Sequence, residues 1–345
     1  MPQPIRVGII GGGWPGGAHA RGYKEAGGFK VVAVADLIPA RRKKLMEESG
    51  ATREYADAIE LVADKDLDVV SVCLPTFLHA QVTVAALKSG KHVLCEKPPA
   101  MDAKEAKKIE AAATKAKKVV LFGTQRRFGG AEQASKQAIE KGYAGDAYHA
   151  RSSWMRTRGI PIGTGWFPDK ARAGGGVLID LGVHMLDLAW HLLGQPKPLS
   201  VFCSTHHRFG ALVDPGLKFD VEDSGFALFR FDGGKTLELS ASWSFNQPPS
   251  QQGTLCRIYG DKGAVDVYTP QGAVIYRNFN EKGEAKPTEL KPPKVTGHPA
   301  LMRHFKQCIE GKATPLTGVK EGVALMQMID AMYRSAESGK SAEVK

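Results

Sequence analysis

The sequence predicts an α/β protein with two domains, the first built on a parallel sheet and the second on an antiparallel sheet. Three observations support this class. The chain has 345 residues, more than one hydrophobic core usually serves. Residues 1–124 alternate short apolar runs with helical patterns, which is typical of β-α-β units. Residues 199–279 contain strand patterns joined by tight turns, which is typical of antiparallel pairing.

The first 124 residues contain five apolar runs that predict strands. Residues 68–74 read Asp-Val-Val-Ser-Val-Cys-Leu, a nearly continuous apolar run of the kind found in strands buried on both faces. Because helical stretches separate these runs, we expect right-handed crossovers and a parallel sheet. The predicted strands are 5–10, 30–35, 68–74, 92–95 and 119–122, and the predicted helices are 18–25, 40–48, 56–63, 79–88 and 103–116.

The pattern changes after residue 125. Residues 146–155 alternate as a strand, and residues 177–193 predict an apolar helix that ends at a glycine and a proline. The glycine-containing turns at 232–234 and 261–263 each separate two strand patterns. They predict consecutive hairpins and therefore an antiparallel sheet. Residues 280–297 are rich in Lys, Pro and Glu and predict a surface loop.

Composition argues against several classes of protein. The formal net charge is +11, but the six lysines of residues 104–118 have no aromatic residues among them. They predict a solvated helix face, and we expect no nucleic-acid partner. No apolar run approaches the roughly 20 residues that cross a bilayer, and no secretory signal pattern is present, so we expect a cytoplasmic location and no membrane partner. Five cysteines without a C-x-x-C pair predict neither a disulfide framework nor a metal site.

A glycine-rich loop directly follows the first predicted strand. Gly11, Gly13 and Gly16 fit G-x-G-x-x-G, which lets the backbone approach a pyrophosphate at a helix N-terminus. Asp36 ends the second predicted strand, where an acidic side chain accepts hydrogen bonds from a ribose diol. Together these features predict a site for NAD. The cationic residues 41–43 leave NADP possible, because they could accept a 2′-phosphate.

Three further motifs carry a family resemblance. Residues 96–98 read E-K-P after a predicted strand, and residues 73–79 read C-L-P-T-F-L-H after another. Residues 174–184 read G-G-G-V-L-I-D-L-G-V-H and lead into the apolar helix. With the glycine loop, and in this order, these motifs resemble the Gfo/Idh/MocA oxidoreductases, which include glucose–fructose oxidoreductase and inositol dehydrogenase. The resemblance covers nearly the whole chain.

The resemblance implies a Rossmann NAD(P)-binding domain at residues 1–124. It implies a second α/β domain at 125–345 with a large, open, mostly antiparallel sheet, which binds substrate and joins subunits into a homodimer or homotetramer. Two predicted helices close the chain, and this region, about 298–338, could pack back on the first domain. The lysine–proline peptide of the family is often cis, so we expect a cis bond at Lys97–Pro98.

Three side chains are expected to carry the chemistry. His184 is the best proton acceptor, because an imidazole titrates near neutral pH. Asp180 lies four residues earlier on the same face of the predicted helix and could orient the imidazole or pass the proton on. Lys97 follows a strand end and could stabilise negative charge on the substrate oxygen. The resemblance implies catalytic roles for the same three residues.

The predicted binding residues surround these three. Cofactor contacts are expected from Gly11, Gly13, Trp14, Gly16, Asp36, Leu74, Pro75, Thr76, His79, Glu96 and Lys97. Substrate contacts are expected from Lys97, Gln125, Arg126, Trp154, Arg156, Arg158, Trp166, Arg172, Asp180 and His184, because aromatic rings beside polar donors suit a sugar. The arginines could instead bind a carboxylate or phosphate, or pair with acids such as Asp169 and Asp180.

The predicted function is hydride transfer between NAD(P) and a secondary hydroxyl of a sugar, an inositol or a related polyol. Two alternatives stay open. The first is a glycoside-processing oxidoreductase that acts at sugar C3, where oxidation acidifies the neighbouring C–H. The second is a non-catalytic regulatory protein that binds NAD(P), since a fold alone does not guarantee catalysis. Such a protein would not need Lys97, Asp180 and His184 together.

Overall fold

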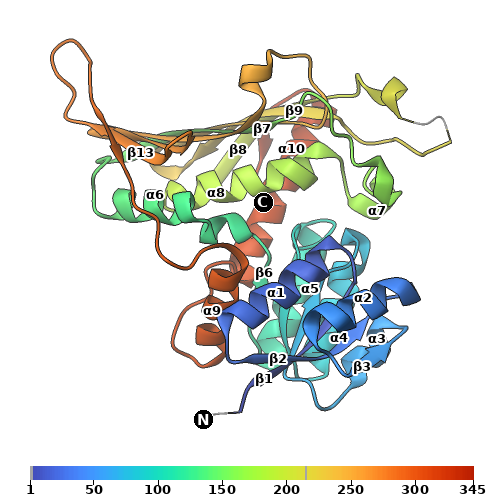
Figure 1. Cartoon of the computed structure of the whole chain (residues 1–345). Coiled ribbons are helices and arrows are strands. Elements are labelled where there is room, and N and C mark those ends of the chain that lie inside the picture. Colours follow the sequence, from blue (N-terminus) through green and yellow to red (C-terminus); the bar gives the residue numbers. More distant parts are fainter. Residues whose placement is uncertain (1–2, 214–215) are drawn as a thin grey trace. The chain divides into compact units, whose positions relative to one another are not determined.

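The chain forms two compact units, drawn in Figure 1. The structure is a computed structural model that describes residues 3–213 and 216–345. The first unit comprises Met1–Phe128 and Val295–Met326, and the second comprises Gly129–Lys294 and Gln327–Lys345. The first unit therefore takes segments from both ends of the sequence.

The first unit contains a six-stranded sheet in the order β3-β2-β1-β4-β5-β6, and all its pairings are parallel. The strand order reverses between β1 and β4. In open parallel sheets of this kind, ligands bind beyond the carboxyl ends of the strands at such a reversal. The strands are β1 (Ile5–Ile10), β2 (Phe29–Ala35), β3 (Arg53–Tyr55), β4 (Val69–Val72), β5 (His92–Cys95) and β6 (Val120–Phe122).

Helices complete the β-α-β units of this sheet, as the sequence predicts. Asp57 caps α3 and Asp102 caps α5 by accepting backbone N–H groups of the first turn. The late helix α9 packs against α1 and adds Leu301 and Phe305 to the core around Val7. The helices are α1 (Trp14–Ala26), α2 (Pro39–Ser49), α3 (Ala58–Ala63), α4 (His79–Lys88), α5 (Ala103–Ala116) and α9 (Gly297–Ile309), with short turns η1 (Thr76–Leu78) and η2 (Gln125–Phe128).

The second unit contains a nine-stranded sheet in the order β14-β13-β12-β11-β7-β10-β9-β8-β15. It is mostly antiparallel, as predicted, but β7 and β10 pair in parallel at its centre. The strands are β7 (Ala147–Met155), β8 (Pro198–His206), β9 (Ser224–Phe231), β10 (Thr236–Ser242), β11 (Gly253–Gly260), β12 (Gly263–Thr269), β13 (Gly272–Arg277), β14 (Pro287–Glu289) and β15 (Ala342–Glu343).

Two helices, α6 and α8, lie along one face of this sheet (Figure 1). The hydroxyl of Ser152 on β7 donates to the carbonyl of Met185 on α8, which ties the central strand to that helix. The helical elements are α6 (Gly130–Glu140), α7 (Lys170–Ala173), the π-helix η4 (Leu178–Gly182), α8 (Val183–Leu192) and α10 (Val319–Ser338), whose residues divide between the units, with the short turns η3 (Ile162–Thr164), η5 (Gly210–Leu212), η6 (Asp232–Gly234) and η7 (Pro249–Gln251).

Within the described residues, no helix combines the length and the apolar character needed to span a bilayer.

Candidate active site

The three motif glycines of the first loop have three different surroundings. Gly11 has a φ of +102°, and a Cβ there would lie 2.1 Å from the carbonyl oxygen of Cys73. A Cβ on Gly16 would lie 2.0 Å from the carbonyl oxygen of Gly11, so the helix could not pack on the loop. A Cβ on Gly13 would meet only Pro15, at 3.7 Å. The backbone at Gly13 therefore faces open space, which fits the close approach of a pyrophosphate.

Asp36 is fixed beside this loop. Its carboxylate accepts the backbone N–H of Gly12 at 2.7 Å and that of Ile38 at 2.8 Å. Arg42 donates to the carbonyl oxygen of Asp36 at 2.8 Å and to the carboxylate of Glu54 at 3.0 Å. The guanidinium of Arg42 thus supports the strand end. The carboxylate of Asp36 is therefore held next to the glycine loop, at the end of β2.

The segments after β4 and β5 are tied together by His79. Its Nδ1 lies 2.7 Å from the carbonyl oxygen of Pro98, and its Nε2 lies 2.8 Å from that of Leu74. The His79 side chain is 1% exposed, so it holds the segments after β4 and β5 from inside the protein. Thr76 is also buried, while Leu74 and Pro75 are half-buried. The Lys97–Pro98 peptide is cis, which confirms the expectation from the sequence.

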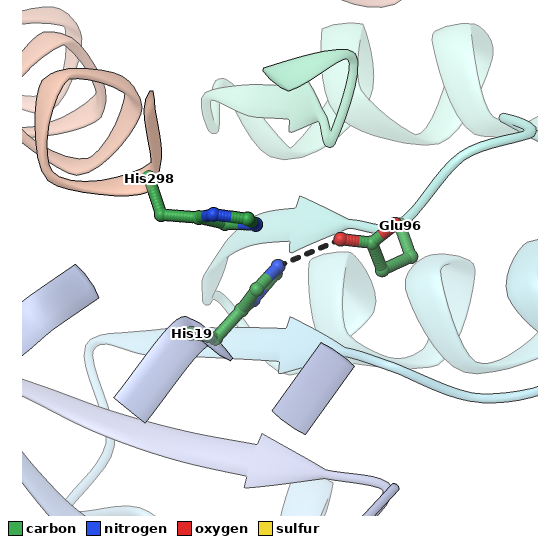
Figure 2. A group of neighbouring side chains, drawn as sticks. All are labelled: His19, Glu96 and His298. Carbon is green, nitrogen blue, oxygen red and sulfur yellow. Dashed lines mark hydrogen bonds and ion pairs between the residues drawn. The ribbon is translucent and has the colours of Figure 1, made fainter. Parts of the chain in front are cut away.

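Glu96 is a buried carboxylate at the end of β5. Its Oε1 lies 2.9 Å from Nε2 of His19, and its Oε2 accepts the backbone N–H of Lys97 at 3.2 Å. Burial opposes ionisation, but the hydrogen bond from His19 and the charges of nearby groups lower the pKa of Glu96 below its usual value. The cluster around Glu96 appears in Figure 2. Glu96 therefore anchors the backbone of Lys97, whose side chain is half-buried.

Gln125 and Arg126 lie in the turn η2, directly after β6. Both are half-buried. The next residue, Arg127, is buried and donates to the carbonyl of Leu316, which holds the turn in place. Gln125 and Arg126 thus follow a parallel strand at its carboxyl end, the edge on which sites of such sheets form.

In the second unit, the π-helix η4 carries Asp180. Asp180 is 8% exposed, and its Oδ2 accepts the indole N–H of Trp243 at 2.9 Å. The entry to η4 is held by Glu222, whose carboxylate accepts the backbone N–H groups of Gly176 and Leu178, both at 2.9 Å. Isolated π turns within helices are frequent at functional sites. The predicted single helix 177–193 is therefore two elements, with the wider turn at Asp180.

His184 lies in the first turn of α8 and is 5% exposed. Its ring centroid is 5.8 Å from that of Trp154 on β7. The guanidinium of Arg156 lies over the same indole, 5.2 Å from the ring centroid, which is within cation–π range. The second unit thus brings together His184, Trp154 and Arg156, an imidazole beside an aromatic face and a cationic donor.

The other predicted substrate residues lie in the loops that follow β7. The Arg158 guanidinium donates to the side-chain oxygen of Asn246 and lies over the ring of Phe209. Trp166 stacks on Phe167 with ring centroids 4.0 Å apart, and Arg172 donates to the carbonyl of Gly165. Arg158, Trp166 and Arg172 are therefore held by contacts with Asn246, Phe209, Phe167 and Gly165. None of these contacts is with Trp154, the ring that lies beside His184.

Asp169 contacts α7 and Lys218. It caps α7 by accepting the N–H of Ala171 and forms an ion pair of 2.6 Å with Lys218. Arg156 and Arg158 donate to neutral oxygen atoms of Gly159, Thr157 and Asn246 in the described part of the chain.

Sequence reasoning missed Trp243 and Glu222. Trp243 is fully buried and lies 63 residues after Asp180, directly after β10. Glu222 lies 46 residues after Gly176, whose N–H it accepts. No local pattern links such distant pairs, because the pairing of β9 and β10 places them. The acidic residues at 220–223, just before a strand pattern, were the only available signal for Glu222.

Comparisons with known proteins bear on both units. Residues 5–124 match the family model of the oxidoreductase family with an NAD-binding Rossmann fold, and residues 133–266 match the GFO/IDH/MocA C-terminal domain. D-glucoside 3-dehydrogenase of Escherichia coli (strain K12) is 32% identical over 353 residues, 99% of this chain and 98% of the relative. Inositol 2-dehydrogenase of Rhizobium meliloti (strain 1021) is 28% identical over 335 residues, 96% of each protein.

A solved structure of GenD2 from gentamicin A biosynthesis, in complex with NAD, has a TM-score of 0.82 to this chain at 25% identity. The match covers 100% of this chain and 97% of that one. The parallel sheet, the glycine loop after β1 and the two family matches define a dinucleotide-binding oxidoreductase. The chain belongs to the Gfo/Idh/MocA family, and its first domain is the NAD-binding Rossmann domain of that family.

Proposed function

We propose that this protein is an NAD-dependent dehydrogenase that oxidises a secondary hydroxyl of a pyranoside, with the 3-hydroxyl of D-glucosides as the expected reacting group. The observation that carries the proposal is the second-unit cluster, in which His184 and the anchored Asp180 accompany the Trp154 ring. An aromatic face beside polar groups suits the apolar face and hydroxyl rim of a sugar. The likeness to D-glucoside 3-dehydrogenase extends over almost all of both chains and favours this substrate class.

Lys97, Asp180 and His184 are proposed to divide the work of alcohol oxidation. His184 takes the hydroxyl proton, because an imidazole is a competent base near neutral pH. Asp180, held by Trp243, keeps a negative charge near that base and stabilises the imidazolium that forms. The ammonium of Lys97 stabilises negative charge on the substrate oxygen. Bound NAD supplies the acceptor for the hydrogen that leaves the carbon.

The cofactor is proposed to lie on the loop after β1 and along the ends of β4 and β5. Gly11, Gly13 and Gly16 form the pyrophosphate cradle, and Asp36 binds the adenosine ribose. Trp14, at the start of α1, is 69% exposed and is available to cover the cofactor. The remaining proposed contacts come from the ends of β4 and β5, namely Leu74, Pro75, Thr76, His79, Glu96 and Lys97.

The proposed substrate contacts are Lys97, Gln125, Arg126, Trp154, Arg156, Arg158, Trp166, Arg172, Asp180 and His184. Since Arg156 and Arg158 already donate to neutral oxygens, a neutral glycoside is favoured over an anionic sugar.

The test is NADH absorbance at 340 nm with methyl β-D-glucoside, D-glucose, myo-inositol and D-glucuronate. We expect reduction of NAD with the glucoside, and deuterium at C3, but not at C2, should slow the reaction and appear in the reduced cofactor. Lys97→Met should lose turnover but bind NAD within about tenfold of the wild type, because most of the proposed cofactor contacts remain. Reduction with myo-inositol alone would replace the glucoside assignment by the polyol one. Tight NAD binding without turnover of any substrate would favour the regulatory alternative.

We further propose that the second-domain sheet joins two copies of the chain. Ser152 faces α8, so its neighbour Arg151 points to the opposite face. Across neighbouring strands Arg151 aligns with Glu238, Leu228 and Phe202. Leu228 and Phe202 are 47% and 49% exposed, and Arg151 and Glu238 form an ion pair of 2.9 Å. Sedimentation should show a dimer or tetramer, and the double change Phe202→Glu, Leu228→Lys should dissociate it.

A further inference from the structure

Three side chains that commonly ligate metals converge in the first unit (Figure 2). His19 comes from α1, Glu96 from the end of β5 and His298 from the start of α9. One ligand atom of each lies within 4.8 Å of the other two. Two imidazoles and one carboxylate form a ligand set that binds Zn²⁺ and related first-row metal ions.

We propose that His19, Glu96 and His298 bind a divalent transition-metal ion, with Zn²⁺ the expected occupant. The count of cysteines predicted no metal site, but this ligand set contains none. His19 is fully buried and Glu96 is 7% exposed, whereas His298 is partly exposed. An ion therefore has a route of entry past His298, and three protein ligands leave a fourth position for water.

Neighbouring hydroxyls orient one ligand in advance. Nδ1 of His19 lies 3.2 Å from Oγ of Ser71, which in turn lies 2.7 Å from the hydroxyl of Tyr23. A ligating histidine usually donates its other ring N–H to such a partner, which fixes the tautomer. When an ion replaces the proton between Nε2 of His19 and Glu96, Nδ1 can donate to Oγ of Ser71. The chain of hydroxyls thus supports metal ligation through Nε2.

The present geometry requires only a small adjustment. Nε2 of His19 and Oε1 of Glu96 are 2.9 Å apart, and ligand atoms around tetrahedral Zn²⁺ are about 3.4 Å apart. His298, with its ring centroid 5.9 Å from that of His19, has to approach the pair by about an ångström. Metal binding would release a proton shared between His19 and Glu96. Affinity for the ion should consequently rise with pH.

An ion held here would link α1, the end of β5 and α9 directly before Lys97. The inference is independent of the substrate proposed above.

The test uses the full chain, freed of metals by chelation and without NAD, and titrated with Co²⁺. We expect one equivalent of Co²⁺ to bind, with visible absorption bands typical of nitrogen and oxygen ligands, and Zn²⁺ to displace it. The Trp14 ring centroid lies 6.2 Å from that of His298, so bound Co²⁺ should quench Trp14 fluorescence. Trp14→Phe should remove this quenching and keep the absorption bands.

Variants localise the site. Loss of a supporting group around a metal ligand costs about 10–100-fold in affinity, so His298→Ala should weaken Co²⁺ binding by at least about 100-fold. His207→Ala removes an exposed histidine of the second unit and should change nothing. His19→Asn gives a second test, with folding checked by circular dichroism. Equal binding by the wild type and a folded His298→Ala protein, or no stoichiometric binding, would overturn the proposal and leave a hydrogen-bonded cluster only.

Discussion

The indole N–H of Trp243 donates a hydrogen bond of 2.9 Å to Oδ2 of Asp180, and both side chains are buried. The bond joins the end of β10 to the π turn η4. It places a hydrogen-bond donor on one carboxylate oxygen that lies one helical turn before His184. The orientation of Asp180 therefore depends on the large sheet as well as on its own helix.

Trp243→Phe should lower kcat, and it should do so more than the control variant Trp190→Phe. Removing a hydrogen bond to a charged group costs about 1.5–3 kcal/mol, which corresponds to roughly a tenfold loss or more in kcat if Asp180 acts in the reaction. The measurement is kcat and KM for the preferred substrate at saturating NAD. Trp190→Phe is the matched control, because its indole N–H donates to the carbonyl of Pro196 at 2.8 Å. Equal kcat losses in both variants would refute a specific role for Trp243.

Gly13→Ala and Gly16→Ala should separate cofactor binding from folding. A Cβ at Gly16 collides with the carbonyl of Gly11, so Gly16→Ala should lose more than about 3 kcal/mol of unfolding free energy. A Cβ at Gly13 has open space, so Gly13→Ala should melt like the wild type but bind NAD at least about tenfold more weakly, since the methyl group occupies the pyrophosphate path. Thermal melting and calorimetric titration measure the two effects. Normal NAD binding by Gly13→Ala would show that the pyrophosphate lies elsewhere.

Asp36→Asn should relax the preference for NAD over NADP. The change removes the negative charge that repels a 2′-phosphate, while Arg42 stays engaged with Glu54. We expect the ratio of kcat/KM for NAD to that for NADP to fall about tenfold or more. Asp57→Asn serves as a control, because Asp57 also accepts two backbone N–H groups but caps α3. An unchanged ratio in Asp36→Asn would exclude Asp36 from cofactor selection.

Glu222→Gln should destabilise the protein although it keeps the shape of the side chain. Both carboxylate oxygens accept backbone N–H groups, and Oε1 also accepts the hydroxyl of Tyr333 at 2.9 Å. A glutamine NH₂ would face one of these donors, at a cost of about 2–4 kcal/mol. Tyr333→Phe removes one bond and should cost about 1–2 kcal/mol. Urea unfolding measures both, and a reversed order would contradict the anchoring role of Glu222.

Protonation of His92 should lower the free energy of unfolding in acid. Its Nδ1 accepts the N–H of Val119 at 3.0 Å, which requires an unprotonated nitrogen. Burial, with the charge of Lys118, lowers the pKa of His92 from 6.5 to about 4. The unfolded chain therefore binds more protons than the folded one between these pH values, and unfolding free energy is lost as pH falls from 6.5 toward 4.

His92→Gln tests this pH dependence. Its amide oxygen can accept the Val119 N–H at every pH, so the variant should lose about 1–2 kcal/mol less than the wild type between pH 7 and pH 4. Urea unfolding at the two pH values gives the difference. Parallel losses in the two proteins would mean that His92 is not protonated differently on folding.

The fold class could be predicted from local patterns. Two elements without an apolar pattern, β3 and α6, could not. The runs at 5–10 and 92–95 match β1 and β5, because a strand buried on both faces needs continuous apolar residues. Strand β3 was missed, since Arg53-Glu54-Tyr55 has no apolar run. Helix α6 was missed as well, because Gly130–Glu140 is mostly small and polar. The apolar pattern of residues 177–193 could not reveal the π turn, because every position in η4 and α8 is buried.

The glycine loop and the position of Asp36 could be predicted because each is a local motif, and the cis Lys97–Pro98 peptide was expected from the family resemblance. The residues that contact the site from distant parts of the sequence could not be predicted. Trp243 reaches Asp180 through strand pairing, and His298 reaches Glu96 through the packing of α9 on α1. Such contacts depend on tertiary structure, which no spacing rule encodes. The roles assigned to Lys97 and His184 stay predictions until the variants are measured.

The packing of α9 in the first core also bears on how this protein is made. Leu301, Met302 and Phe305 share a core cluster with Val7 and Leu94, strand residues of the first unit. A ribosome has therefore translated residues 129–294 of the second unit before the last core residues of the first one emerge. The NAD-binding domain cannot reach its final packing early in translation, although domains near the N-terminus generally fold first. The second unit likewise needs Gln327–Lys345, which includes strand β15 at the edge of its sheet, so neither unit can complete its packing until nearly the whole chain has been made.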